Sequence, residues 1–164
     1  MAIQNIIEYP NSLLRKNSTR VTKFDSEFQT LVNDLIETML QQDSMGLAAP
    51  QIGVLQRVFV LNRQRILGRK NQEYQPNNIL CVANPEIKCK ECLIDSPEGC
   101  LSIPQQRGIA KRFERIQLKG VDRNGYPLSI RADGMLSILI QHEIDHLDGI
   151  LFIDRVIEEV EALF

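Results

Sequence analysis

The most regular hydrophobic pattern in the chain begins at Ser26 and predicts a helix. Apolar residues recur there every three or four positions and would share one helix face: Phe28, Leu31, Val32, Leu35, Ile36 and Met39. Ser26, followed three residues later by Gln29, fits a capping box at the start of the helix. We therefore expect an amphipathic helix whose apolar face packs against a core.

Two short runs in the middle of the chain have the composition of β-strands. Residues 57–62 and 79–83 are rich in β-forming side chains, and we expect Pro85 to end the second run. The segment between them, residues 63–78, is polar and contains glycine and proline. This composition predicts an exposed loop.

The second half of the chain predicts a hairpin followed by a buried helix. Residues 116–121 and 128–132 flank an Asn-Gly dipeptide, the strongest short signal for a β-hairpin. Residues 135–142 (MLSILIQH) are apolar on nearly every side, as in a helix enclosed by a core. This order of elements, without regular βαβ alternation, predicts an α+β fold with antiparallel β-sheets packed around a central buried helix.

Composition narrows the class of protein without naming its chemistry. The 164 residues are 43% hydrophobic, which suits one domain spanning residues 1–164. A net charge of -2, from 19 basic and 21 acidic residues, gives no evidence of a nucleic-acid site. The sequence shows no targeting segment and no membrane span, so we expect a cytoplasmic protein with free cysteines available as ligands.

The buried helix carries an H-E-x-x-H motif at residues 142–146. His142 and His146 are four residues apart, so both project from one helix face and can bind one metal ion. Glu143 lies beside them as a candidate general base. Both histidines of the chain are in this motif, and unpaired imidazoles in a core would be costly to desolvate. The pattern therefore favours a metal site over two structural histidines.

A catalytic site of this type needs a third protein ligand, for which the sequence offers three candidates. A metzincin would have histidine where this chain has Phe152, so that pattern fails. A thermolysin-like ligand would be a downstream glutamate, which leaves Glu158, Glu159 and Glu161 in what reads as a surface helix. Cys100 follows a glycine and offers a thiolate suited to zinc or ferrous iron. Cys100 is the best candidate.

Three segments together resemble the signature motifs of peptide deformylases. They are residues 46–51 (GLAAPQ), 98–102 (EGCLS) and 141–149 (QHEIDHLDG), in the family's order, and the resemblance covers nearly the whole chain. One residue departs from the pattern, because the family usually has glycine where this chain has Ser44. We expect activity to survive this change, since the chemistry does not need that residue.

The resemblance implies a metal-dependent hydrolase that removes the N-formyl group from the N-terminal methionine of newly made polypeptides and releases formate. In this family, Glu143 would move the proton, while the Gln51 amide and the Leu101 backbone N–H would stabilise the oxyanion. The metal would be held by Cys100, His142 and His146. The resemblance favours Fe²⁺ as the native ion, and Zn²⁺ also suits the same ligands.

Substrate preference can be partly predicted from the residues around the motif. Met135, Ile138 and Leu139 precede His142 on the same helix face, so the wall beside the metal is apolar. Together with Met45, this wall could receive a methionine side chain, although the same residues could be only core.

Three further residues are expected beside the substrate. The backbone of Met45, Gly46 and Gly99 would pair with an extended peptide. Glu98 would lie beside the site, paired with an arginine such as Arg107 or Arg112.

Two other functions remain open from the sequence. One is an H-E-x-x-H peptidase with a C-terminal glutamate ligand, and the other is a metal-stabilised binding module without catalysis. Cys89 and Cys92 form one C-x-x-C, but a second is missing and an extended segment would point them to opposite faces, so no second metal or redox site is expected. The resemblance also suggests transient contact with the ribosome, although residues 156–164 contain no lysine or arginine with which to bind RNA.

Overall fold

The computed structural model describes residues 2–69 and 75–160. Three α-helices and six strands follow one another in the order α1 (Ser26–Gln41), β1 (Gly46–Ala48), β2 (Val58–Asn62), α2 (Arg63–Ile66), β3 (Ile79–Cys100), β4 (Ile103–Val121), β5 (Pro127–Asp133), α3 (Gly134–Leu147) and β6 (Val156–Val160) within these residues. Short 3₁₀ turns lie at Ser12–Arg15, Ala49–Ile52, Pro76–Asn78 and Phe152–Asp154. No helix in the described part of the chain is long and apolar enough to cross a membrane.

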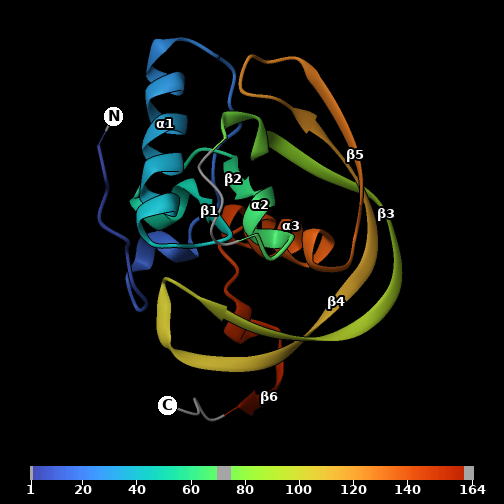
Figure 1. The fold of residues 1–164 in the computed structure, drawn as a ribbon. Coiled ribbons are helices and arrows are strands. Elements are labelled where there is room, and N and C mark those ends of the chain that lie inside the picture. Colours follow the sequence, from blue (N-terminus) through green and yellow to red (C-terminus); the bar gives the residue numbers. More distant parts are fainter. Residues whose placement is uncertain (1, 70–74, 161–164) are drawn as a thin grey trace.

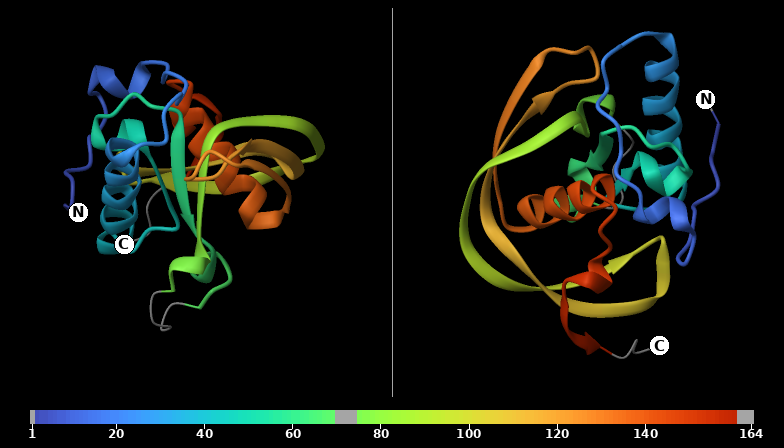
Figure 2. Two further views of the ribbon diagram at one scale, coloured as in Figure 1. Left: turned by 90° about the horizontal axis from the view of Figure 1, so that it is seen from above. Right: turned by 180° about the vertical axis from the view of Figure 1, so that it is seen from behind.

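The strands form one antiparallel sheet, which confirms the predicted α+β class. Their order is β1-β2-β3-β4-β5, and β6 also pairs with β4. The long strands β3 and β4 curve around α3, which lies inside the bend, while α1 lies on the other side of β1 and β2 (Figures 1 and 2). The curved sheet therefore encloses α3 on the side of β3 and β4.

Strand β2 shows how the two helices share the sheet. Val58 and Val60 belong to the buried cluster that includes the apolar face of α1. Phe59 and Leu61 belong to the cluster that includes Ile140 of α3. Successive side chains of a strand point to opposite faces, so covering both faces buries every residue from Val58 to Leu61. This arrangement places the site helix against the centre of the sheet.

Helix α1 forms as predicted, but its cap lies one residue earlier. The Asp25 side chain accepts a hydrogen bond from the Phe28 backbone N–H at 3.2 Å, so Asp25 is the N-cap and Ser26 is the first helical residue. The Gln29 Oε1, the atom that would close a capping box, instead accepts from Arg123 Nε at 2.9 Å, and the Gln29 amide nitrogen donates to the Arg123 carbonyl at 2.7 Å. The predicted capping box is therefore wrong, because a tertiary contact takes the amide that would have closed it.

Strand β3 is far longer than predicted, and Pro85 does not end it. The pairing with β4 shifts between Ala83 and Glu86, and Asn84 adopts a left-handed φ of 50°. An irregularity of this kind accommodates a proline, which lacks an N–H, inside a sheet. The strand continues to Cys100 because β4 pairs with it along its length.

The predicted hairpin is confirmed, whereas two other segments differ from the sequence expectation. β4 and β5 pair from Val121 opposite Pro127 to Arg115 opposite Asp133. The expected loop after β2 begins with the one-turn helix α2, and its residues 70–74 lie outside the described residues. The expected C-terminal surface helix is strand β6, which pairs with Arg107–Ala110 of β4. Glu161 lies outside the described residues.

Candidate metal centre and active site

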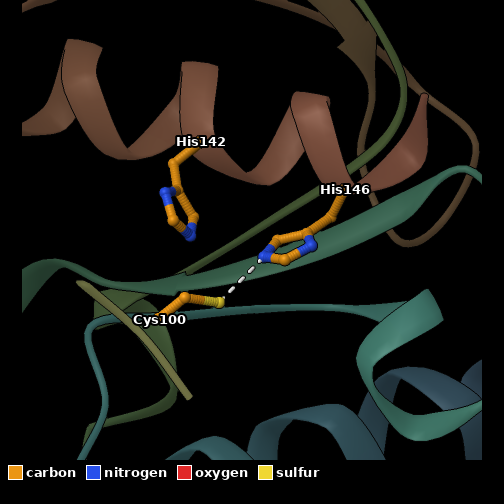
Figure 3. Close-up of side chains that lie close together, drawn as sticks. All are labelled: Cys100, His142 and His146. Atoms are coloured by element: carbon orange, nitrogen blue, oxygen red, sulfur yellow. Dashed lines mark hydrogen bonds between the residues drawn. The ribbon is translucent and has the colours of Figure 1, made fainter. Parts of the chain in front are cut away.

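Helix α3 and the end of β3 bring three candidate ligands together. His142 and His146 project from adjacent turns of α3, and Cys100 reaches them from the last residue of β3 (Figure 3). Cys100 Sγ lies 3.2 Å from His146 Nε2, and the ligand atoms of all three residues lie within 4.8 Å of one another. All three residues are buried.

The donor set fits a divalent metal ion. Bond lengths of about 2.0–2.3 Å in tetrahedral geometry separate ligand atoms by roughly 3.3–3.8 Å. The 3.2 Å between Cys100 Sγ and His146 Nε2 is close to this range, and the other pairs lie within 4.8 Å. Burial alone would raise the pKa of the Cys100 thiol, but His146 and His142 lower this pKa well below its ordinary value, towards the thiolate that binds metals. The rival Glu158 is exposed on β6, and the structure does not bring it into this cluster.

Glu98 fixes the orientation of His142. Its Oε2 lies 2.9 Å from His142 Nδ1, and Arg112 donates to the same carboxylate from Nε at 2.6 Å and from a terminal nitrogen at 2.9 Å. Burial raises the pKa of Glu98, but the hydrogen bonds from Arg112 and His142 have the larger combined effect and lower this pKa to about 2. An ionised Glu98 accepts the Nδ1–H and leaves Nε2 of His142 available for a metal. Of the two arginines considered, Arg112 is therefore the partner.

A second carboxylate, which the sequence analysis did not single out, extends this network. Asp145 accepts from Arg112 at 2.6 Å, and Arg155 contacts both of its oxygens at 2.5 and 2.7 Å. Glu98, Asp145 and Arg112 are each at most 8% exposed, so their charges compensate one another away from water. The available signal was a further carboxylate within the H-E-x-x-H motif, on the helix predicted to be buried.

Glu143 is buried beside the histidines. It is 3% exposed, and burial raises its pKa to about 7 against the opposing effect of His142 and His146. Its Oε2 has no hydrogen-bond partner among the described residues. A Cβ added at Gly46 would lie 2.6 Å from Glu143 Oε1, so only glycine lets β1 approach this carboxylate.

Gln51 reaches the cluster from the turn after β1. Its Oε1 accepts from the Ala48 N–H at 2.9 Å, which points the amide nitrogen towards Ser102 Oγ at 3.3 Å and Cys100 Sγ at 3.5 Å. The Gln51 side chain therefore stabilises its own loop, and its amide N–H group lies beside the candidate ligand Cys100.

A cavity of about 150 Å³ opens beside Cys100 and His142. Every residue expected to contact substrate lines it: Met45, Gly46, Glu98, Gly99, Met135, Ile138 and Leu139, together with Gln51, Leu101 and Glu143. Met135 is 46% exposed, so it lies at the rim and not in the core. Ser44 and Pro97 also line the cavity, and neither was predicted to do so.

Cys89 and Cys92 lie on β3 and are exposed, whereas Cys81, on the same strand, is buried. Cys92 adopts a φ of 56°, and its Sγ lies 3.0 Å from a terminal nitrogen of Arg115. Cys89 Sγ lies 3.9 Å from Glu91 Oε1.

Comparison with known proteins agrees with this geometry. The family model described as polypeptide deformylase matches residues 3–162. The chain belongs to the polypeptide deformylase family. A peptide deformylase of Thermodesulfovibrio yellowstonii is 42% identical over 164 residues, covering 100% of this chain and 95% of the relative.

Solved structures of the family have the same fold. A peptide deformylase from Legionella pneumophila superposes with a TM-score of 0.85 and 39% identity, covering 94% of this chain and 86% of the other. The peptide deformylase from Thermotoga maritima superposes with a TM-score of 0.84 and 34% identity, covering 95% of this chain and 99% of the other. As a member of this family, the chain is a metal-dependent hydrolase that removes the N-formyl group from nascent peptides.

Proposed function

We propose that Cys100, His142 and His146 hold the divalent ion of this deformylase, with Fe²⁺ as the native ion. The observation that carries the proposal is the convergence of these three ligand atoms within 4.8 Å. One thiolate and two imidazoles also suit zinc, so Zn²⁺ is the expected substitute. When bound, the ion makes water acidic enough to yield a nucleophile near neutral pH and polarises the formyl carbonyl.

Glu143 moves the proton in this proposal. Its position on the cavity wall and its raised pKa of about 7 suit a group that accepts a proton from water and later gives one up. The carboxylate takes the water proton as the formyl carbon is attacked, and it then delivers that proton to the departing amine. The products are formate and a free N-terminus.

Gln51 and Leu101 stabilise the oxyanion that forms on the formyl group. The Gln51 amide is already aimed at the cluster by the Ala48 contact, so it needs no reorganisation during the reaction. Leu101 directly follows Cys100 in the sequence and lines the cavity. Loss of one such donor typically lowers the rate about 100- to 1,000-fold.

Formylmethionine is recognised by the apolar wall of Met135, Ile138 and Leu139 with Met45, because the formyl group has no side chain of its own to select. The peptide backbone pairs with Gly46 and Gly99 in the manner of an added strand. We further propose a single-domain enzyme that works in the cytoplasm, with transient contact at the ribosomal exit.

Formate release from formyl-Met-Ala-Ser tests this proposal, run anaerobically with iron for the parent and Glu143→Gln. The variant should lose about 100- to 10,000-fold in kcat, because an amide cannot carry the proton. Glu158→Gln, an exposed residue on β6, is the matched control and should match the parent. Equal, negligible release from the parent and Glu143→Gln, with metal bound to both, would instead support a binding module.

A further inference from the structure

Ser44, the residue that departs from the family pattern, bonds to the residue that lies against Glu143. Its hydroxyl donates to the Gly46 carbonyl at 2.9 Å, and its Oγ lies 3.4 Å from the Gly46 N–H as a weak acceptor. Its own N–H donates to the Met39 carbonyl at 3.0 Å, which anchors Ser44 to the end of α1. A glycine at position 44 could make neither of the two hydroxyl contacts.

The two Gly46 groups that Ser44 contacts face the free edge of the sheet. The Asn62 N–H donates to the Met45 carbonyl at 2.8 Å, so Met45 directs its backbone groups towards β2. Successive residues of an antiparallel strand alternate in direction, and Gly46 therefore directs its N–H and C=O away from β2. Strand β1 ends the order β1-β2-β3-β4-β5, and among the residues that the structure describes no strand pairs with it on that side.

This edge borders the reacting centre. Ser44 and Gly46 line the same cavity as Glu143 and Cys100. Gly46 also lies so close to Glu143 that a Cβ there would be 2.6 Å from its Oε1. A peptide chain that adds to β1 beside the metal centre would use the Gly46 N–H and C=O.

We propose that Ser44 is a positioning residue that occupies the edge groups of Gly46 in the free protein and must be displaced by the main chain of the substrate. This inference rests on the proposed binding of the peptide as an added strand. The hydroxyl satisfies backbone groups that an edge strand would otherwise expose. It therefore weakens substrate binding by the hydrogen bond that is broken, equivalent to about 2- to 10-fold in KM.

Three variants separate the hydroxyl from the side-chain volume: Ser44→Ala, Ser44→Gly and Ser44→Thr. Formate release from formyl-Met-Ala-Ser, measured with equal iron content, should show KM about 2- to 10-fold lower for Ala and for Gly. Their kcat should stay close to that of the parent, because the hydroxyl acts on binding and not on proton transfer. Ser44→Thr retains the hydroxyl and should keep the parent KM. Ser129→Ala, an exposed serine on β5, controls for loss of a hydroxyl elsewhere.

An unchanged or higher KM in Ser44→Ala would overturn the inference. A lower KM in Ser44→Gly alone would also overturn it, because the effect would then come from backbone freedom and not from the hydroxyl. Unfolding midpoints of all variants show whether each one is folded at the assay temperature. These outcomes leave formate release by the parent intact, so they differ from a failure of the proposed function, in which the parent releases none.

Discussion

Helices α1 and α3 pack against opposite faces of the same strands, yet they bury different kinds of side chain. The buried residues of α1 are Phe28, Val32, Leu35, Ile36, Thr38 and Met39, of which Thr38 alone is polar. Those of α3 are Ser137, Ile140, Gln141, His142, Glu143, Asp145, His146 and Leu147, and six of these eight are polar. One helix contributes apolar area, whereas the other holds polar groups away from water.

The polar groups of α3 are tolerated because most of them have partners. Gln141 bonds to the backbone of Phe113 at 2.7 and 3.0 Å, and Ser137 donates to the Phe113 carbonyl at 2.8 Å. The unpaired buried side-chain atoms of α3, among the described residues, are Glu143 Oε2 and His146 Nδ1. Desolvation without a partner is costly, so an unpaired atom in an otherwise satisfied helix indicates a functional position. Glu143 is the proposed proton carrier.

Arg112→Met should give the largest loss of stability, since it removes the shared partner of two buried carboxylates. Breaking one side of a buried ion pair typically costs about 3–5 kcal/mol in the free energy of unfolding. Denaturant unfolding at matched metal content measures the loss. Arg15→Met is the control: its pairing with Asp154 is more than a third exposed on both sides and should contribute less than about 1 kcal/mol. Similar losses for the two variants would show that the network around α3 is no more costly to break than a surface pair.

Sequence patterns predicted what is local in this molecule. The periodicity of α1, the Asn-Gly hairpin and the spacing of His142 and His146 each depend on neighbouring residues. What the patterns missed depends on contacts between distant segments. β3 runs to Cys100 because β4 pairs with it, and residues 156–160 form a strand because β4 offers an edge.

In the candidate site, too, local features were predicted and contacts between distant segments were missed. The motif residues were predicted from the order of the motifs, and the apolar wall from the spacing of residues along the helix. The link from Glu98 through Arg112 and Asp145 to Arg155 was missed, apart from the choice of Arg112 or Arg107 for Glu98. Its members come from β3, β4, α3 and the turn before β6, and no local pattern connects them. The contact of Ser44 with Gly46 was missed because only the departure from glycine was visible.

Leu35→Ala tests whether α1 serves stability alone. Leu35 is fully buried in the cluster between α1 and the sheet, so its truncation should cost about 2–5 kcal/mol through lost burial and a cavity. Formate release per folded molecule should be unchanged at a temperature well below unfolding, because α1 contributes no residue to the cavity wall. Gln41→Ala, at an exposed position of α1, should change stability by less than about 0.5 kcal/mol. A clear fall in kcat for Leu35→Ala would mean that α1 also shapes the site.

The starts of the two helices give the smallest and most direct comparison. Asp25 caps α1 with a hydrogen bond to the Phe28 N–H, whereas Asp133 stands at the same position before α3 without a side-chain cap bond. Asp25→Ala should cost about 1 kcal/mol in the free energy of unfolding, and Asp25→Asn should retain most of it, because asparagine caps equally well. Asp133→Ala loses only the attraction of a carboxylate to the helix dipole, typically 0.3–1 kcal/mol and reduced by salt. Both variants lose the salt-screened dipole attraction, so at high salt Asp25→Ala should keep the part of its loss that comes from the cap hydrogen bond, whereas the loss in Asp133→Ala should nearly vanish. Equal losses at high salt would mean that α3 also depends on a cap at Asp133.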